Sequence, residues 1–232
     1  MAAQNFRRHD FGSRELLAAD LADRIAAQLS AAIAERDAAT IAVSGGTTPA
    51  LLFEMLSKSD IDWRSVNVTL IDERFVPESS PRSNANLVKA KLLQNKAAKA
   101  NFLPLYASGD VSADISNAEH HLAVFHNPLD VAILGMGNDG HTASFFPDAE
   151  ELERLLDPQS SDFVAAVHAQ SAGELRLTLT LPLICRARFL ALHIEGAEKL
   201  ATLERALAPG STLPIRRVID AAHTPVEIFW AP

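Results

Sequence analysis

The sequence contains only one cysteine, Cys185, so no disulfide can form within the chain. Nothing therefore requires an oxidising compartment. The four residues before Cys185 are apolar, which favours a small buried side chain over a reactive nucleophile.

The sequence also lacks a long apolar run, because charges such as Asp20 and Asp23 interrupt the alanine-rich stretch 16–34. This argues against a signal-peptide core and a membrane span, and we expect a cytoplasmic protein.

Positive charge is scarce, since 21 Lys and Arg stand against 29 Asp and Glu, for a net charge of -8 and a pI near 5.5. Nucleic acids attract concentrated Lys and Arg, so this balance argues against a nucleic-acid partner. A small anion needs only a local group of cations. The length of 232 residues fits one domain, and no linker, low-complexity tract or fixed-period repeat divides residues 1–232.

Short apolar runs alternate with segments of helical periodicity along the whole chain. This alternation predicts an α/β fold with a mostly parallel, helix-flanked open sheet. Crowding of strands after Phe163 suggests that one edge is antiparallel. The pattern predicts helices at 14–36, 50–56, 85–94, 112–125 and 197–207, and strands at 40–43, 66–71, 102–105, 129–134, 163–167, 176–181, 188–194 and 226–230.

Three of the predicted strands end in unusual polar segments, at 44–48, 72–74 and 137–144. The carboxyl ends of parallel strands lie on one edge of a sheet, where open α/β sheets bind their ligands. We therefore expect these three segments to converge, although dozens of residues separate them.

The first segment, Ser44-Gly-Gly-Thr-Thr-Pro49, leads from a strand into a helix. Gly45 and Gly46 permit a sharp turn, and together with Thr47 they offer backbone donors to a phosphate or carboxylate at a helix start. The segment is neither a Walker loop nor the Gly-x-Gly-x-x-Gly pattern of dinucleotide sites. The alternative interpretation is an ordinary strand-to-helix turn.

The second segment, Asp72-Glu73-Arg74, follows a strand directly. Side chains alternate in extended backbone, so Asp72 and Arg74 can point into one cleft while Glu73 points elsewhere. A solvated charge cluster is the alternative.

The third segment, Gly135-Met-Gly-Asn-Asp-Gly-His-Thr-Ala-Ser144, places Asp139 and His141 among glycines at the end of a buried strand. A histidine beside a carboxylate can act as a general base near neutral pH. The alternative is a histidine that only forms hydrogen bonds within its loop. Convergence of the three segments would favour the catalytic interpretation.

Two further cations are candidates for binding an anion. Arg176 opens a predicted strand, and Lys199 lies near a helix start. Either can be an ordinary surface charge, but in the cleft they would supply the cations that a phosphate ester requires.

Three histidines, at positions 120, 121 and 126, lie close together in the sequence. Because His120, His121 and His126 lack the spacing of a helical zinc site, we predict an exposed helix face and no metal.

Taken together, these motifs resemble the bacterial 6-phosphogluconolactonases of the glucosamine-6-phosphate isomerase/6-phosphogluconolactonase family. The resemblance covers nearly the whole chain. It rests on segments 44–49, 72–77 with Ser83-Asn84, 135–144, 176–180 and 196–199.

The resemblance implies a Rossmann-like fold, as in glucosamine-6-phosphate deaminase. It also implies hydrolysis of 6-phospho-D-glucono-1,5-lactone to 6-phosphogluconate in the oxidative pentose phosphate pathway. It implies no metal, no organic cofactor and no obligate protein partner. The resemblance implies that His141 is the general base and that Asp139 orients its imidazole. It implies that Arg74, Arg176 and Lys199 bind the phosphate and the developing negative charge, with further donors from Gly45, Gly46 and Thr47. Asp72 would either contact the substrate or position Arg74.

Two other functions remain alternatives. A sugar-phosphate isomerase or deaminase of the same fold normally carries a Glu near the end of the glycine-histidine segment, where this chain has Phe145-Phe146. A non-enzymatic sugar-phosphate sensor would need a DNA-binding module, and no basic helix-turn-helix precedes Arg14. Both observations favour the lactonase.

Overall fold

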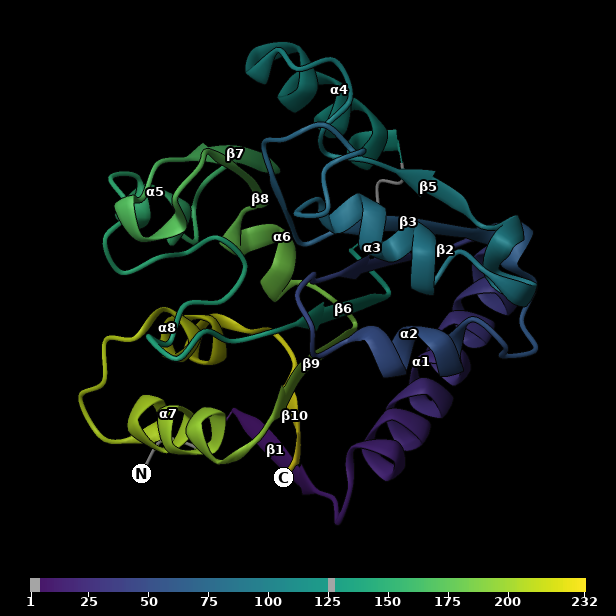
Figure 1. Cartoon of the computed structure of the whole chain (residues 1–232), viewed down its shortest axis with the longest axis horizontal. Helices are drawn as coiled ribbons and strands as arrows, with labels where there is room; N and C mark the ends of the chain where they lie inside the picture. Colours follow the sequence, from purple (N-terminus) through teal and green to yellow (C-terminus); the bar gives the residue numbers. More distant parts are fainter. Residues whose placement is uncertain (1–4, 125–127) are drawn as a thin grey trace.

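The main sheet of the molecule consists of parallel strands (Figure 1). The computed structural model describes residues 5–124 and 128–232. The strands of this sheet are β1 Phe6–Asp10, β2 Ala39–Val43, β3 Val66–Leu70, β5 Asn101–Leu103, β6 Val131–Leu134, β9 Phe189–Glu195 and β10 Val226–Ala231. Their order is β1-β10-β9-β6-β2-β3-β5, and every neighbouring pair is parallel. The predicted parallel sheet is confirmed.

The central strands β2 and β6 are buried along their whole length, as expected for a sheet covered on both faces. From β2 the chain continues to β3 on one side, and it later returns to β6 on the other side. The strand order therefore reverses between β2 and β6. Such a switch point leaves a crevice outside the carboxyl ends of the two strands.

Helices flank the sheet on both sides, and Figure 1 shows α1 and α2 on one side of the strands and α7 and α8 on the other. The helices are α1 Arg14–Arg36, α2 Ala50–Leu56, α3 Asn84–Lys91, α4 Val111–Val124, α5 Leu152–Leu155, α6 Leu181–Cys185, α7 Ala197–Leu207 and α8 Pro214–Ala221. Short 3₁₀ turns lie at Trp63–Ser65, Asn95–Lys99 and Gln170–Ala172. Among the described residues, no helix is both long and apolar enough to cross a membrane.

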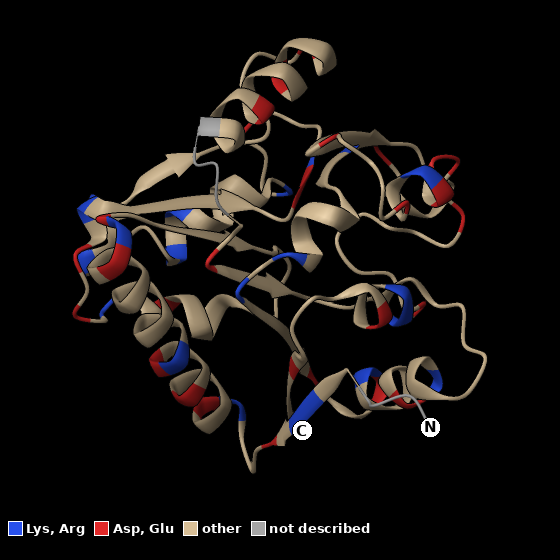
Figure 2. Cartoon of the chain, turned by 180° about the vertical axis from the view of Figure 1, so that it is seen from behind, with Lys and Arg blue, Asp and Glu red and all other residues tan. Residues whose placement is uncertain are grey.

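Local hydrogen bonds define both ends of the long helix α1. The Ser13 hydroxyl accepts a hydrogen bond from the Leu16 N–H at 3.3 Å and so caps the first turn. The left-handed Asp37 ends the helix, and its N–H donates to the Ile33 carbonyl. Buried Leu and Ile side chains face β2, β6 and β10. The outer side of α1 carries charges of both signs, interspersed along its length (Figure 2).

A second, smaller sheet contains the antiparallel strands β4 Asp72–Arg74, β8 Arg176–Leu179 and β7 Val164–Val167, in the order β4-β8-β7. The prediction of an antiparallel edge on the main sheet is therefore wrong. Ile71 joins the two sheets, because its N–H donates to Val43 in β2 while its carbonyl accepts from Leu179 in β8. The chain leaves the main sheet at this residue and starts the second one.

Several element boundaries differ from the predictions. The strand predicted at 176–181 ends at Leu179, because α6 begins at Leu181 with Pro182 in its first turn. Neither β1 nor α8 was predicted. By contrast, α1, α2 and α7 have the predicted bounds.

The histidines near the end of α4 only partly fit the predicted exposed face. His120 is exposed, but His121 is half-buried and its Nδ1 atom is inaccessible to solvent. His126 and the predicted helix end at Phe125 lie outside the described residues.

Candidate active site

A cavity of about 400 Å³ opens at the switch point, beyond the carboxyl ends of β2 and β6. Its walls come from the loops after β2 and β6, from β4 and β8 of the second sheet, and from the start of α7. The three polar segments at 44–48, 72–74 and 137–144 meet here, so the predicted convergence is found. Eight of the nine candidate site residues line the cavity, namely Gly45, Gly46, Thr47, Asp72, Arg74, His141, Arg176 and Lys199. Asp139 does not line it.

The loop after β2 forms one wall. The Ser44 N–H donates to the Ile133 carbonyl at 3.0 Å, and the Ser44 hydroxyl accepts from the Gly135 N–H at 3.2 Å. These bonds tie the loop to the end of β6. A Cβ atom on Gly45 would lie 1.8 Å from Asn84 Oδ1, so only glycine fits there. Within the part of the chain that the structure describes, the N–H groups of Gly45, Gly46 and Thr47 donate to no protein acceptor.

His141 and Asp139 form a hydrogen-bonded pair at the end of the loop after β6. Asp139 Oδ1 lies 2.6 Å from His141 Nδ1 and also accepts from the His141 N–H at 3.1 Å. A carboxylate only accepts hydrogen bonds, so Nδ1 is the donor in this pair; in the neutral imidazole, Nε2 is then the nitrogen with the free lone pair. Nε2 has no hydrogen-bond partner among the described residues. Asp139 therefore stands behind His141 and fixes its ring.

Glycine and phenylalanine neighbours shape the surroundings of this pair. A Cβ atom on Gly137 would lie 2.2 Å from His141 Nδ1 and 2.3 Å from Asp139 Oδ1, so the pair rests directly on the glycine backbone. On the other side, the Phe146 ring lies 4.4 Å from the His141 ring, centroid to centroid. Phe146 is 5 % exposed and gives the imidazole an apolar support.

Side chains alternate along β4 as predicted. Asp72 and Arg74 line the cavity, whereas Glu73 points away and is 1 % exposed. Glu73 accepts four hydrogen bonds, from the N–H groups of Arg74, Asn84 and Ala85 and from the Ser83 hydroxyl, at 2.7–3.0 Å. This buried carboxylate joins β4 to the first turn of α3 and so fixes the direction of its two neighbours.

Arg74 and Arg176 lie opposite each other on neighbouring strands of the second sheet. Both line the cavity. Burial lowers the pKa of Arg176 from its ordinary value, while the nearby Asp72 carboxylate raises it and Arg74 lowers it further. The Arg176 Nε atom is buried and has no hydrogen-bond partner among the residues that the structure describes. Two guanidinium groups placed this way can together bind a dianion.

Asp72 is hydrogen-bonded to Ser144, in the loop that carries His141. Its carboxylate accepts from the Ser144 hydroxyl at 2.7 Å, and its charge acts on Arg176. No ion pair joins Asp72 to Arg74 within the described residues. Asp72 thus links β4 to the loop that carries His141 and partly balances the charge of Arg176.

Lys199 approaches the cavity from the first turn of α7. Its ammonium group donates to the Met136 carbonyl. Burial lowers the pKa of Lys199 from its ordinary value, whereas the Asp139 and Glu198 carboxylates oppose that change. An ammonium has three donors, so this lysine can hold the loop and still bind an anion.

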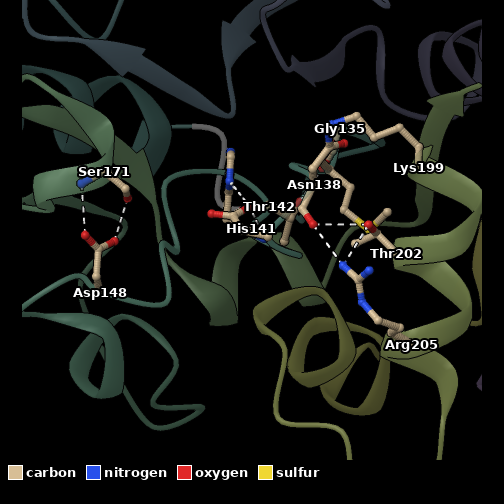
Figure 3. Close-up of polar contacts among 11 residues, drawn as sticks. Gly135, Asn138, His141, Thr142, Asp148, Ser171, Lys199, Thr202 and Arg205 are labelled. Carbon is tan, nitrogen blue, oxygen red and sulfur yellow. Dashed lines mark hydrogen bonds and ion pairs between the residues drawn. The ribbon is translucent and has the colours of Figure 1, made fainter.

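The polar lining residues that were not predicted as site residues include Asn84, Ser171 and His193. Asn84 donates through Nδ2 to the Asp72 carbonyl at 2.8 Å, and its buried Oδ1 atom has no partner in residues 5–124 and 128–232. Ser171 donates its N–H and its hydroxyl to Asp148, at 2.9 and 2.6 Å (Figure 3). His193 lies on β9 and is 3 % exposed. Asn84 could be found through the Ser83-Asn84 motif, but no local pattern distinguishes Ser171 or His193.

Known proteins resemble this chain over nearly its whole length. The family model described as "Glucosamine-6-phosphate isomerases/6-phosphogluconolactonase" matches residues 12–230. A 6-phosphogluconolactonase of Mesorhizobium japonicum is 58% identical and covers 96% of this chain and 94% of its own length. One from Rhizobium meliloti is 47% identical, with 97% and 98% covered. The crystal structure of a 6-phosphogluconolactonase from Shewanella baltica has a TM-score of 0.93 at 39% identity and covers 98% of both chains.

Proposed function

Because this chain belongs to the glucosamine-6-phosphate isomerase/6-phosphogluconolactonase family, we propose that His141 is the general base with which it hydrolyses 6-phospho-D-glucono-1,5-lactone. The product is 6-phosphogluconate, and the reaction belongs to the oxidative pentose phosphate pathway. The cytoplasmic location expected from the sequence stays a prediction.

One observation carries the assignment of the base: His141 Nδ1 is bound to Asp139 at 2.6 Å, on the rim of the cavity that holds Arg74 and Arg176. The bond to Asp139 leaves Nε2 as the basic atom. A base and a dianion site in one cavity suit a substrate that carries both a phosphate and an electrophilic carbonyl.

In the reaction, His141 Nε2 takes a proton from a water molecule as the water oxygen bonds to C1 of the lactone. The carbonyl π-electrons move onto the oxygen, and Asp139 stabilises the imidazolium ion that forms. When the tetrahedral intermediate collapses, the bond between C1 and the ring oxygen breaks. The imidazolium returns its proton to that oxygen, which becomes the C5 hydroxyl, and the new carboxylic acid ionises in solvent.

The anionic parts of the substrate require donors at two places. Arg74 and Arg176 together bind the phosphate, since two guanidinium groups present parallel donors to its oxygens. Lys199 and the N–H groups of Gly45, Gly46 and Thr47 are the donors left for the charge that develops on the carbonyl oxygen.

A deaminase or isomerase reaction finds no support at the position of its acid. Phe145 and Phe146 are 0 % and 5 % exposed, and Phe146 packs on the His141 ring. An apolar support cannot transfer protons during ring opening. We therefore expect no ammonia release from glucosamine 6-phosphate.

The test compares His141→Ala with a matched histidine outside the cavity. His168 is such a control, because its N–H and Nδ1 contact Glu151 at 2.9 and 2.7 Å, as His141 contacts Asp139. With fresh lactone and subtraction of spontaneous hydrolysis, His141→Ala should lose about 10²–10⁴-fold in kcat, the usual contribution of a general base. It should still bind 6-phosphogluconate, and His168→Ala should match the wild type. Turnover retained by His141→Ala would refute the assignment.

A further inference from the structure

The loop that carries the catalytic pair contains a turn whose central peptide is held from outside. Residues 137–140 form this turn, closed by the Gly140 N–H donating to the Gly137 carbonyl at 3.0 Å. The peptide between Asn138 and Asp139 lies at its centre. In β-turns this central peptide can flip, and the flip changes the backbone angles of the residue that follows it. Here that residue is Asp139, the partner of His141.

Two side chains of α7 bind the carbonyl of this central peptide (Figure 3). The Thr202 hydroxyl donates to the Asn138 carbonyl at 3.1 Å, and Arg205 Nη2 donates to the same oxygen at 3.0 Å. Arg205 Nη2 also lies 3.0 Å from the Thr202 hydroxyl oxygen, so the two donors support each other. Thr202 is 1 % exposed, whereas Arg205 is exposed at the surface.

The same helix holds the loop at two further points. The Asn138 side-chain amide donates to Glu198 at 3.0 Å, and the Lys199 ammonium donates to the Met136 carbonyl. Glu198, Thr202 and Arg205 are spaced four and three residues apart, which places them on one face of α7. This face is therefore directed at the catalytic loop.

We infer that Thr202 and Arg205 are positioning residues for the reaction: they fix the orientation of the Asn138–Asp139 peptide and thereby hold Asp139 against His141. This role rests on the function proposed for His141. Neither residue lines the cavity, so neither contacts the substrate. Their loss should affect kcat and leave substrate binding nearly unchanged.

The experiment uses Thr202→Val, Arg205→Met and the double variant. Each single variant leaves the other donor on the Asn138 carbonyl, so we expect kcat to fall only two- to threefold. The double variant leaves the carbonyl without a protein donor, and kcat should fall at least about tenfold, more than the product of the singles. KM, and Kd for 6-phosphogluconate, should stay within about twofold, because these contacts do not involve cavity residues.

Two controls separate positioning from a general loss of stability. Thr69→Val removes a buried threonine hydroxyl that donates to the Leu103 carbonyl at 2.9 Å, away from the loop, and should keep its kcat. Thr202→Ser, with Arg205 intact, keeps the hydroxyl donor. Its kcat should therefore be closer to that of the wild type than the kcat of Thr202→Val. The NMR signal of the His141 Nδ1 proton should exchange faster with water in the double variant only.

The possible results test the positioning role of Thr202 and Arg205 separately from the proposed role of His141. If the double variant matches Thr69→Val in kcat and keeps the wild-type Nδ1 proton signal, the positioning role is wrong. If His141→Ala retains turnover, the proposed base is wrong, and the proton signal still tests whether α7 orients the pair. If Thr202→Val does not fold, the exposed Arg205 still provides a test. Arg205→Met must then lower kcat with KM unchanged, and an unchanged kcat of Arg205→Met would overturn the positioning role.

Discussion

Arg74 and Arg176 face each other directly across the antiparallel pair β4 and β8. Like charges directly opposite on neighbouring strands are destabilising. Arg176 is 9 % exposed, and within the described part of the chain its Nε atom has no hydrogen-bond partner. The Glu174 carboxylate, 3.4 Å from Arg176, offsets part of this repulsion. In the function proposed above, a phosphate dianion bound between the two guanidinium groups would offset the rest.

Replacing Arg176 with Met should selectively weaken binding of the phosphorylated substrate. A hydrogen bond to a charged group contributes about 1.5–3 kcal/mol, which corresponds to a rise in KM of about 10- to 100-fold. kcat should change little, because His141 is untouched. The unliganded variant should melt somewhat below the wild type, because Arg176 pairs with the nearly buried Glu174 at 3.4 Å and donates to the Ala172 carbonyl at 3.0 Å.

Steady-state kinetics with 6-phosphogluconolactone and with unphosphorylated glucono-1,5-lactone test this expectation. The variant should lose activity toward the first and keep it toward the second. Arg64→Met, which changes an exposed arginine far from the cavity, serves as the control. An equal loss with both lactones would show that Arg176 does not recognise the phosphate.

Gly137→Ala should inactivate the enzyme without unfolding it. The added methyl group would occupy the space of the bond between His141 and Asp139, 2.2 Å from Nδ1. The pair must separate, so kcat should fall by about 10² or more, within the range of general-base catalysis. Gly12→Ala is the matched control, because a Cβ atom there meets nothing within 4 Å. Turnover and thermal unfolding measured together distinguish a displaced pair from a damaged fold, and wild-type turnover would contradict the expectation.

Local patterns were sufficient for elements with strong periodicity or flanking signals. α1 and α7 have the predicted bounds because apolar residues recur at helical spacing, and Ser13 caps the start of α1. The alternation of Asp72, Glu73 and Arg74 was also predictable, because it needs only extended backbone. The partner of β4 was not, since β8 lies about a hundred residues later and three residues carry no periodic signal.

Other features depend on tertiary contacts or have weak signals. β1, with the sequence Phe-Arg-Arg-His-Asp, is an edge strand rich in charge, so it lacks the apolar run typical of a parallel strand. α8 did carry a signal, in Pro214 at its start and in the helical spacing of Ile215, Val218 and Ile219. The position of Asp139 behind His141, and not in the cavity, follows from a turn geometry that residue types alone do not specify.

Glu73→Gln should destabilise the fold. Both carboxylate oxygens of this buried group accept two hydrogen bonds each, and an amide NH₂ would meet two of those donors. The loss should be about 2–4 kcal/mol, as for buried polar groups left without partners. For a chain of this size that corresponds to a fall in Tm of about 5–15 °C.

Calorimetry or circular dichroism can measure this loss, with Glu78→Gln as the control. Glu78 lies in the loop after β4, is half-exposed, and pairs with Lys89 at 2.7 Å. A surface pair contributes about 0–1 kcal/mol, so the control should change Tm little. Equal melting of both variants would contradict a structural role for the Glu73 hydrogen bonds.

Lys199 should make anion binding sensitive to alkaline pH. Burial lowers the pKa of this lysine, so its positive charge is lost at a lower pH than for an exposed lysine. Binding of 6-phosphogluconate should therefore be strongest below that lowered pKa and weaken as the pH rises through it. Arg176 stays charged throughout, which leaves Lys199 as the titrating cation of the cavity.

Lys199→Arg should remove most of the alkaline loss of binding, because arginine does not deprotonate in this range. Titration calorimetry between about pH 7 and 10 compares the two proteins without interference from spontaneous lactone hydrolysis, and identical pH profiles would exclude Lys199 from the binding site.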